Sequence, residues 1–131
     1  MNVPPELRYT KDHEWARLED GGIRIGITDF AQDALGDVVF VQLPTVGAQI
    51  QEGATFSEVE STKSVSDIYA PVTGEVVEVN VTLGDAPQRV NEDPYGDGWI
   101  CVIAPGDPAG FERLLDADAY RALVSGDAAA E

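Results

Sequence analysis

Residues 36–42, Gly-Asp-Val-Val-Phe-Val-Gln, return in altered form as residues 74–80, Gly-Glu-Val-Val-Glu-Val-Asn. Four of the seven positions are identical, and each copy runs through an aliphatic residue into a turn that ends in glycine. A repeated strand-and-turn unit predicts two similar β layers facing each other, as a flattened antiparallel barrel or sandwich. Two unrelated segments with a common strand-and-turn pattern remain the alternative.

The residues before the first copy predict a hairpin and one short helix. Apolar and polar residues alternate over 13–27, and Asp-Gly-Gly at 20–22 supplies the turn. Thr28 is a suitable N-cap for a helix near residues 29–35, and Gly36 is a suitable left-handed stop. We therefore expect a mainly β chain in which this helix interrupts the strands.

A second hairpin is expected between the two copies of the repeat. Residues 54–60 and 65–70 have strand character, and Ser-Thr-Lys-Ser at 61–64 joins them with small polar residues that tolerate a turn. Lys63 is thereby predicted at the hairpin tip.

The C-terminal third changes from strand to helix. Residues 99–103 are apolar on both faces and predict an interior strand with Cys101 in the core. A helical segment is expected at about 108–125, followed by a frayed tail over 126–131. We expect a single domain over 1–131, with its core at about 9–104.

The charge and residue inventory exclude several classes of function. The 131 residues hold 24 Asp and Glu against 8 Lys and Arg, a formal charge of -16, which disfavours binding to nucleic acid or to an anionic membrane surface. His13 and Cys101 are the only residues of their types, which disfavours a metal cluster or a Cys/His nucleophile pair. No apolar run has the length of a membrane span.

Lys63 is the residue that can carry chemistry, although a lysine in a turn is ordinarily only a solvated charge. A Schiff-base role would need a lowered pKa, whereas the nearby Glu58, Glu60 and Asp67 favour the protonated amine. Small neighbours leave the amine sterically open. An open lysine of this kind is better suited to attach a cofactor that brings its own reactivity.

Several blocks in order resemble the glycine cleavage system H-protein family. The central block is Val-Glu-Ser-Thr-Lys-Ser-Val-Ser-Asp-Ile-Tyr-Ala-Pro at 59–71, followed by the second copy of the repeat. Further matching blocks are residues 9–15, 25–32, 43–44, 46–47 and 91–99. Two positions depart from the family pattern, Ser57 in place of a frequent glycine and Ser64 in place of a common alanine.

The resemblance implies a non-catalytic carrier with lipoic acid in amide linkage on Lys63. Such a carrier takes the aminomethyl group of glycine from a pyridoxal-phosphate glycine decarboxylase to a tetrahydrofolate-dependent aminomethyltransferase. The FAD enzyme dihydrolipoamide dehydrogenase reoxidises it, and a lipoyl transferase or ligase attaches the group. The fold implied is that of lipoyl and biotinyl carriers.

The resemblance also implies a cleft into which the loaded arm folds back. Glu14, in the His-Glu-Trp block, is then a candidate contact for the charged amine, against the alternative of a solvated strand residue. For His13 we expect a structural role.

Alternative functions remain open. They are lipoyl relay to other lipoate-dependent enzymes, a lipoyl domain of a 2-oxoacid dehydrogenase, a biotin carrier and an unmodified acidic interaction module. Biotin carriers typically bracket the lysine with methionines, whereas the neighbours here are Thr62 and Ser64. We expect a monomer in a bacterial cytoplasm, with a mature mitochondrial matrix protein as the alternative.

Overall fold

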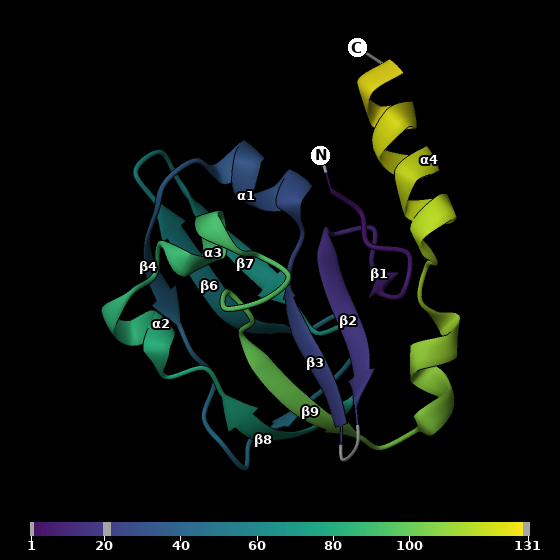
Figure 1. Cartoon of the computed structure of the whole chain (residues 1–131). Coiled ribbons are helices and arrows are strands. Elements are labelled where there is room, and N and C mark those ends of the chain that lie inside the picture. Colours follow the sequence, from purple (N-terminus) through teal and green to yellow (C-terminus); the bar gives the residue numbers. More distant parts are fainter. Residues whose placement is uncertain (1, 20–21, 130–131) are drawn as a thin grey trace.

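Two antiparallel sheets make up the centre of the molecule (Figure 1). The structure is a computed structural model that describes residues 2–19 and 22–129. The larger sheet has the strand order β1 (Arg8–Tyr9), β2 (Glu14–Glu19), β3 (Gly22–Ile27), β9 (Cys101–Pro105), β8 (Gly74–Val79) and β5 (Gln49–Ile50). The smaller sheet has the order β4 (Val38–Gln42), β6 (Thr55–Ser61) and β7 (Val65–Tyr69).

The repeated sequence supplies one strand to each sheet, β4 to the smaller and β8 to the larger. This confirms the expected mainly β architecture of two layers. The layers are unequal, with six strands against three, and they form an open sandwich and not a closed barrel.

The core lies between the sheets and consists of branched aliphatic side chains from the inward positions of both. Among them are Ile23, Ile25, Val41, Val59, Ile68, Val76 and Ile103. Cys101 is fully buried there, and burial raises the pKa of its thiol to about 12. The prediction of Cys101 as a small core residue is confirmed.

Helix α1 (Asp29–Leu35) follows β3 with the predicted ends. Thr28 Oγ1 accepts a hydrogen bond from the backbone N–H of Ala31 at 3.2 Å, which caps the first turn. Gly36 ends the helix at φ 82°, and its N–H donates to the Gln32 carbonyl at 3.0 Å. A positive φ at this position explains the glycine.

Two short helices lie where the sequence predicted no helix, α2 (Thr82–Asp85) and α3 (Arg89–Glu92). The expected C-terminal segment at 108–125 is a 3₁₀ helix, η1 (Pro108–Arg113), and a separate helix, α4 (Ala117–Ala129). Helix α4 thus extends four residues into the segment 126–131, for which a frayed tail was predicted. Residues 130–131 of that predicted tail lie outside the described residues, as do residues 20–21 of the first hairpin turn.

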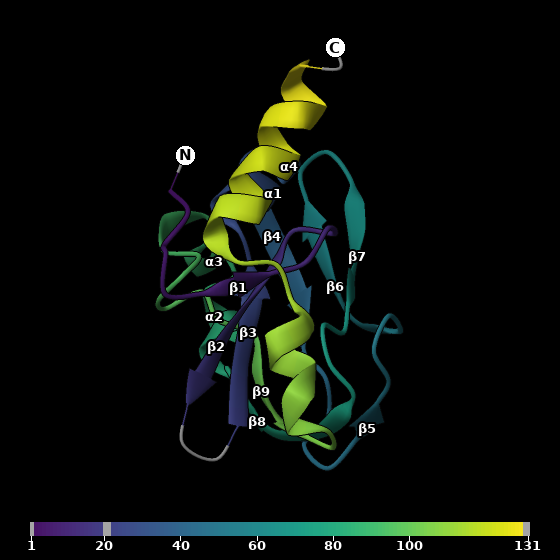
Figure 2. The ribbon, with the colours of Figure 1, turned by 90° about the vertical axis from the view of Figure 1, so that its right-hand side faces the viewer.

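Helix α4 packs with the N-terminal segment on the outer side of the larger sheet (Figure 2). Tyr120 stacks on Tyr9 with ring centroids 4.6 Å apart, and its hydroxyl lies 2.8 Å from both Thr28 Oγ1 and His13 Nδ1. His13 thus joins β2 to α4, in agreement with the structural role expected for it. Within 2–19 and 22–129, no helix is long and apolar enough to cross a membrane.

Candidate functional site

The hairpin of β6 and β7 holds Lys63 at its tip. The N–H of Ser61 donates to the carbonyl of Ser64 at 2.8 Å, and Ser61 Oγ accepts from the N–H groups of Lys63 and Ser64, both at 3.1 Å. The Thr62 N–H donates to the carbonyl of Asp37 at 3.0 Å, which ties the tip to the residue before β4. Hydrogen bonds therefore fix the backbone on both sides of Lys63, as in a well-ordered turn.

The side chain of Lys63 is exposed and lies beside the end of α1. A Cβ placed on Gly36 would lie 3.0 Å from Lys63 Cε, so the glycine leaves the room that the lysine stem occupies. The C-terminal end of a helix carries a partial negative charge, which suits the ammonium. A modifying enzyme can thus reach an amine whose root is rigid.

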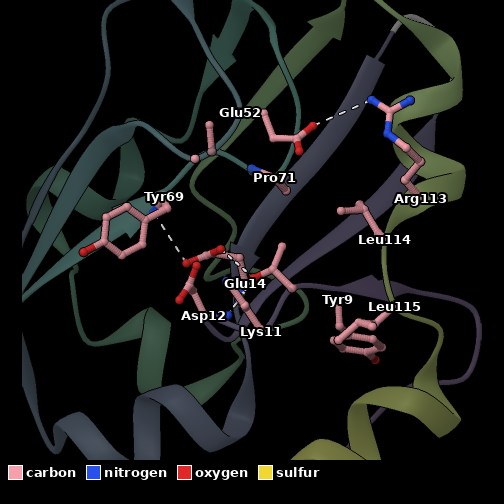
Figure 3. Close-up of a pocket in the computed structure, with 13 residues that line it drawn as sticks. Tyr9, Lys11, Asp12, Glu14, Glu52, Tyr69, Pro71, Arg113, Leu114 and Leu115 are labelled. Atoms are coloured by element: carbon pink, nitrogen blue, oxygen red, sulfur yellow. Dashed lines mark hydrogen bonds and ion pairs between the residues drawn. The ribbon is translucent and has the colours of Figure 1, made fainter.

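Glu14 lies at the start of β2, and its side chain is only 1% exposed. Thr10 Oγ1 donates to its Oε1 at 2.6 Å, and the backbone N–H of Tyr69 donates to its Oε2 at 3.4 Å (Figure 3). The alternative of a solvated strand residue is therefore wrong, because the carboxyl is turned inward and held from two elements.

Burial raises the pKa of Glu14 from 4.5 to about 7. The hydrogen bonds from Thr10 and from the Tyr69 backbone favour the ionised form and limit this rise, while the nearby Asp12 charge adds to it. A cation placed beside the carboxyl would favour its ionised form and lower this pKa.

The Glu14 side chain lines a cavity of about 450 Å³. Its walls come from residues 9–12, from the loop before β6, from the end of β7 and from the end of η1, as Figure 3 shows. Arg113 stands at this cavity, where its Nη2 is 3.7 Å from Glu52 Oε1. Segments that are remote in the sequence thus form the walls of this open cavity.

A second hollow of about 180 Å³ lies between α1 and β7, where Leu35 and Ala34 face Ser66 and Ile68. Asp12 lines both hollows, so they adjoin. The strand β7 runs from the tip past both of them. Its four steps from Val65 to Tyr69 cover about 13 Å at roughly 3.3 Å per residue.

The structure places the two residues singled out in the sequence at opposite ends of β7. Lys63 stands at the tip, and Glu14 lies where β7 ends, with no ion pair between them in the described chain. Sequence reasoning missed Thr10, Tyr69 and Arg113 as parts of the cavity. Thr10 and Tyr69 lie inside the matching blocks, whereas nothing in the local sequence marks Arg113.

Comparisons with known proteins agree on one family. A family model described as glycine cleavage H-protein matches residues 7–127. The glycine cleavage system H protein of Anaeromyxobacter sp. (strain K) is 55% identical over 124 residues, which cover 95% of this chain and 97% of the relative. That of Mycobacterium avium (strain 104) is 57% identical over 129 residues, which cover 95% and 98%.

A solved structure has the same fold. The crystal structure of a glycine cleavage system H protein from Mycobacterium marinum superimposes with a TM-score of 0.87 at 43% identity, covering 94% of this chain and 99% of that one. The chain therefore belongs to the glycine cleavage H-protein family.

Proposed function

We propose that Lys63 is the lipoylation site of this chain and that Glu14 receives the charged amine of the loaded arm. The observation that carries the proposal is the pairing of an exposed lysine on a fixed hairpin tip with a buried carboxyl in a cavity at the other end of β7.

Family membership gives the general role. Glycine cleavage H-proteins carry covalently attached lipoate, and the chain is a lipoyl carrier of the glycine cleavage system and not a catalytic enzyme. When bound, the lipoyl group would supply a disulfide that is reductively opened as it takes up the aminomethyl group of glycine, and the dithiol left after transfer of that group would be reoxidised to the disulfide.

Lys63 provides the anchor. Its amine is exposed for acylation, and the hydrogen bonds of Ser61 fix its backbone while the four-carbon stem stays free to turn. Gly36 leaves room for the Lys63 stem beside the end of α1, and the neighbouring Leu35 lines the hollow between α1 and β7. This hollow adjoins the Glu14 cavity at Asp12, so one attached group could reach both.

Glu14 provides the counter-charge. A positive amine in the cavity would lower the raised pKa of this carboxyl and pair with its ionised form. Thr10 and the Tyr69 backbone hold the carboxyl oxygens in place, so little reorganisation is needed.

The partners proposed for this chain follow from that role. They are the pyridoxal-phosphate glycine decarboxylase, the tetrahydrofolate-dependent aminomethyltransferase, the FAD enzyme dihydrolipoamide dehydrogenase and a lipoyl transferase or ligase. We place the chain in a bacterial cytoplasm, in line with its bacterial relatives, as a monomer that meets each enzyme in turn.

Exchange of labelled carbon dioxide into glycine, measured with the cognate glycine decarboxylase, tests the function. The lipoylated chain should support exchange, and Lys63→Arg should abolish it while leaving the unfolding free energy within about 0.5 kcal/mol, since the side chain is exposed. Arg89→Lys exchanges the same two side chains on α3, outside the Glu14 cavity and the hollow between α1 and β7; it is the matched control and should retain exchange. Exchange supported by Lys63→Arg, or none with the lipoylated wild type, would refute the proposal.

A further inference from the structure

The outer face of the smaller sheet exposes large apolar side chains next to the hairpin tip. Phe40 is 50% exposed on β4 and Val65 is 56% exposed on β7. Phe40 pairs with Glu60, and Glu60 pairs with Val65, so the three residues form one row across the sheet. Residues directly opposite in antiparallel strands share a face. We call the outer face of β4, β6 and β7 the tip face.

Strand alternation explains why these residues are exposed, but not why the exposed residues are apolar. Val41 and Val59 form the next row and are buried in the core, as a half-buried sheet requires. The outward row would then be polar, yet Phe40 and Val65 are there. A bulge between Val38 and Phe40 turns Val39 outward as well, at 52% exposure. Adjoining exposed apolar residues mark an interaction surface more often than isolated ones do.

The remaining charges on these three strands have one sign. Glu58, Glu60 and Asp67 are their only charged residues, and no lysine or arginine occurs on them. Within the described residues these carboxylates form no ion pair; the ion pairs there involve Arg8, Arg17, Arg24, Arg89, Arg113 and Arg121. A hollow of about 250 Å³ bordered by Gln42, Phe56 and Glu58 lies further along the same strands.

We propose that the tip face docks a partner enzyme through an apolar socket ringed by lysine and arginine, with Phe40 entering the socket. The charge pattern selects this occupant, because a second copy of the chain would bring its own carboxylates against Glu58, Glu60 and Asp67. The position of the tip face also favours a partner enzyme as the occupant. The row that contains Phe40 adjoins the turn that holds Lys63. The inference rests on the proposed role of Lys63, because an enzyme that receives the lysyl arm must approach this end.

Docking through the tip face does not require the lipoyl group, so binding can be measured without it. The dissociation constant of the full-length Lys63→Arg chain is measured by surface plasmon resonance against the cognate glycine decarboxylase and against the aminomethyltransferase. Adding Phe40→Ser should weaken binding to at least one of them about tenfold, the effect of removing an interface anchor. Leu18→Ser is the matched control, because Leu18 is 61% exposed on β2 of the other sheet and should change neither constant.

The charge component is tested in the same assay. Glu58→Gln should weaken binding at low salt and reduce its salt dependence, whereas Glu78→Gln, on β8 of the larger sheet, should not. Dissociation constants for Phe40→Ser equal to those of the parent with both enzymes would overturn the inference, and so would concentration-dependent self-association of the chain that Phe40→Ser abolishes. Neither outcome depends on whether Lys63 is lipoylated. Failure of the docking proposal can therefore be distinguished from failure of the proposed lipoylation of Lys63.

Discussion

Glu14 stores free energy that depends on pH. Its pKa is about 7 in the folded chain against 4.5 when solvated, so between these values the folded chain holds a proton that the unfolded chain has lost. The stabilising contribution is complete below about pH 4.5 and disappears as pH rises through about 7, with a limit of about 3 kcal/mol. Above about pH 7 the buried charge of Glu14 thus lowers the stability of the carrier without its load. In the loaded carrier, a positive amine beside the carboxylate would offset this loss.

Replacing Glu14 by Gln should remove this dependence. The amide is neutral and similar in shape, and it can accept from the Tyr69 N–H and donate to Thr10 Oγ1. The unfolding free energy of wild type relative to Glu14→Gln, from urea titrations at pH 5, 6, 7 and 8, should fall by about 2 to 3 kcal/mol over this range. A difference that is constant with pH would contradict the burial of an ionisable Glu14.

Single residues differ in how visible their roles are in the sequence. The tip position of Lys63 follows from its immediate neighbours, because small polar residues between two strand-like segments define a turn. The burial of Glu14 cannot be predicted from its neighbours in the sequence. Its cavity is lined by Tyr69 and Arg113, which only the folded topology brings near. Side chains that meet through topology leave no local pattern to read.

The junction of α1 and β4 depends on one backbone conformation. Gly36 has φ 82° and ψ -159°, a combination that is essentially restricted to glycine and costs an L-residue about 1–3 kcal/mol, and an added Cβ would also contact the Lys63 stem at 3.0 Å. Gly36→Ala should therefore destabilise the chain by about 1–3 kcal/mol in chemical denaturation.

Gly84→Ala is the matched control for this change. Gly84 lies in α2, and a Cβ there would meet nothing within 4 Å, so the substitution should be neutral or stabilise by up to about 1 kcal/mol. Equal effects of the two substitutions would mean that the positive φ at Gly36 is not required.

Elements with strong periodicity or caps could be predicted, and short ones could not. The bounds of α1 follow from Thr28 and Gly36, and the hairpin of β6 and β7 follows from its alternation around a polar turn. The four-residue helices α2 and α3 are shorter than any window in which a helical period can be recognised. The two-residue strands β1 and β5 could not be predicted from the sequence for the same reason.

Two hydrophobic clusters hold together the part of the chain that the structure describes, residues 2–19 and 22–129. One lies between the two sheets, and the other joins the N-terminal segment, the outer side of the larger sheet and α4. Trp15 belongs to the second cluster, whereas its paired neighbour Gly26 adjoins Ile25 of the first, so β2 and β3 connect the two. On this basis we propose that residues 1–131 form a single domain, with both clusters losing their packing together.

Coincident unfolding transitions would be the signature of that single domain. Far-ultraviolet circular dichroism reports on both sheets and the helices, and tryptophan fluorescence reports on Trp15 and Trp99 in the second cluster. Urea midpoints from the two probes should agree within error. An earlier transition in fluorescence alone would show that the α4 cluster separates from the sandwich before it unfolds.

The central claim is that Lys63 carries the lipoyl group, and the most direct measurement is the mass of the intact chain from cells supplied with lipoate, followed by peptide mapping. We predict one lipoyl increment, located on the peptide that holds Lys63, with Lys11 unmodified and with no increment in Lys63→Arg. An unmodified Lys63 from such cells, or a biotinyl increment in its place, would contradict the account.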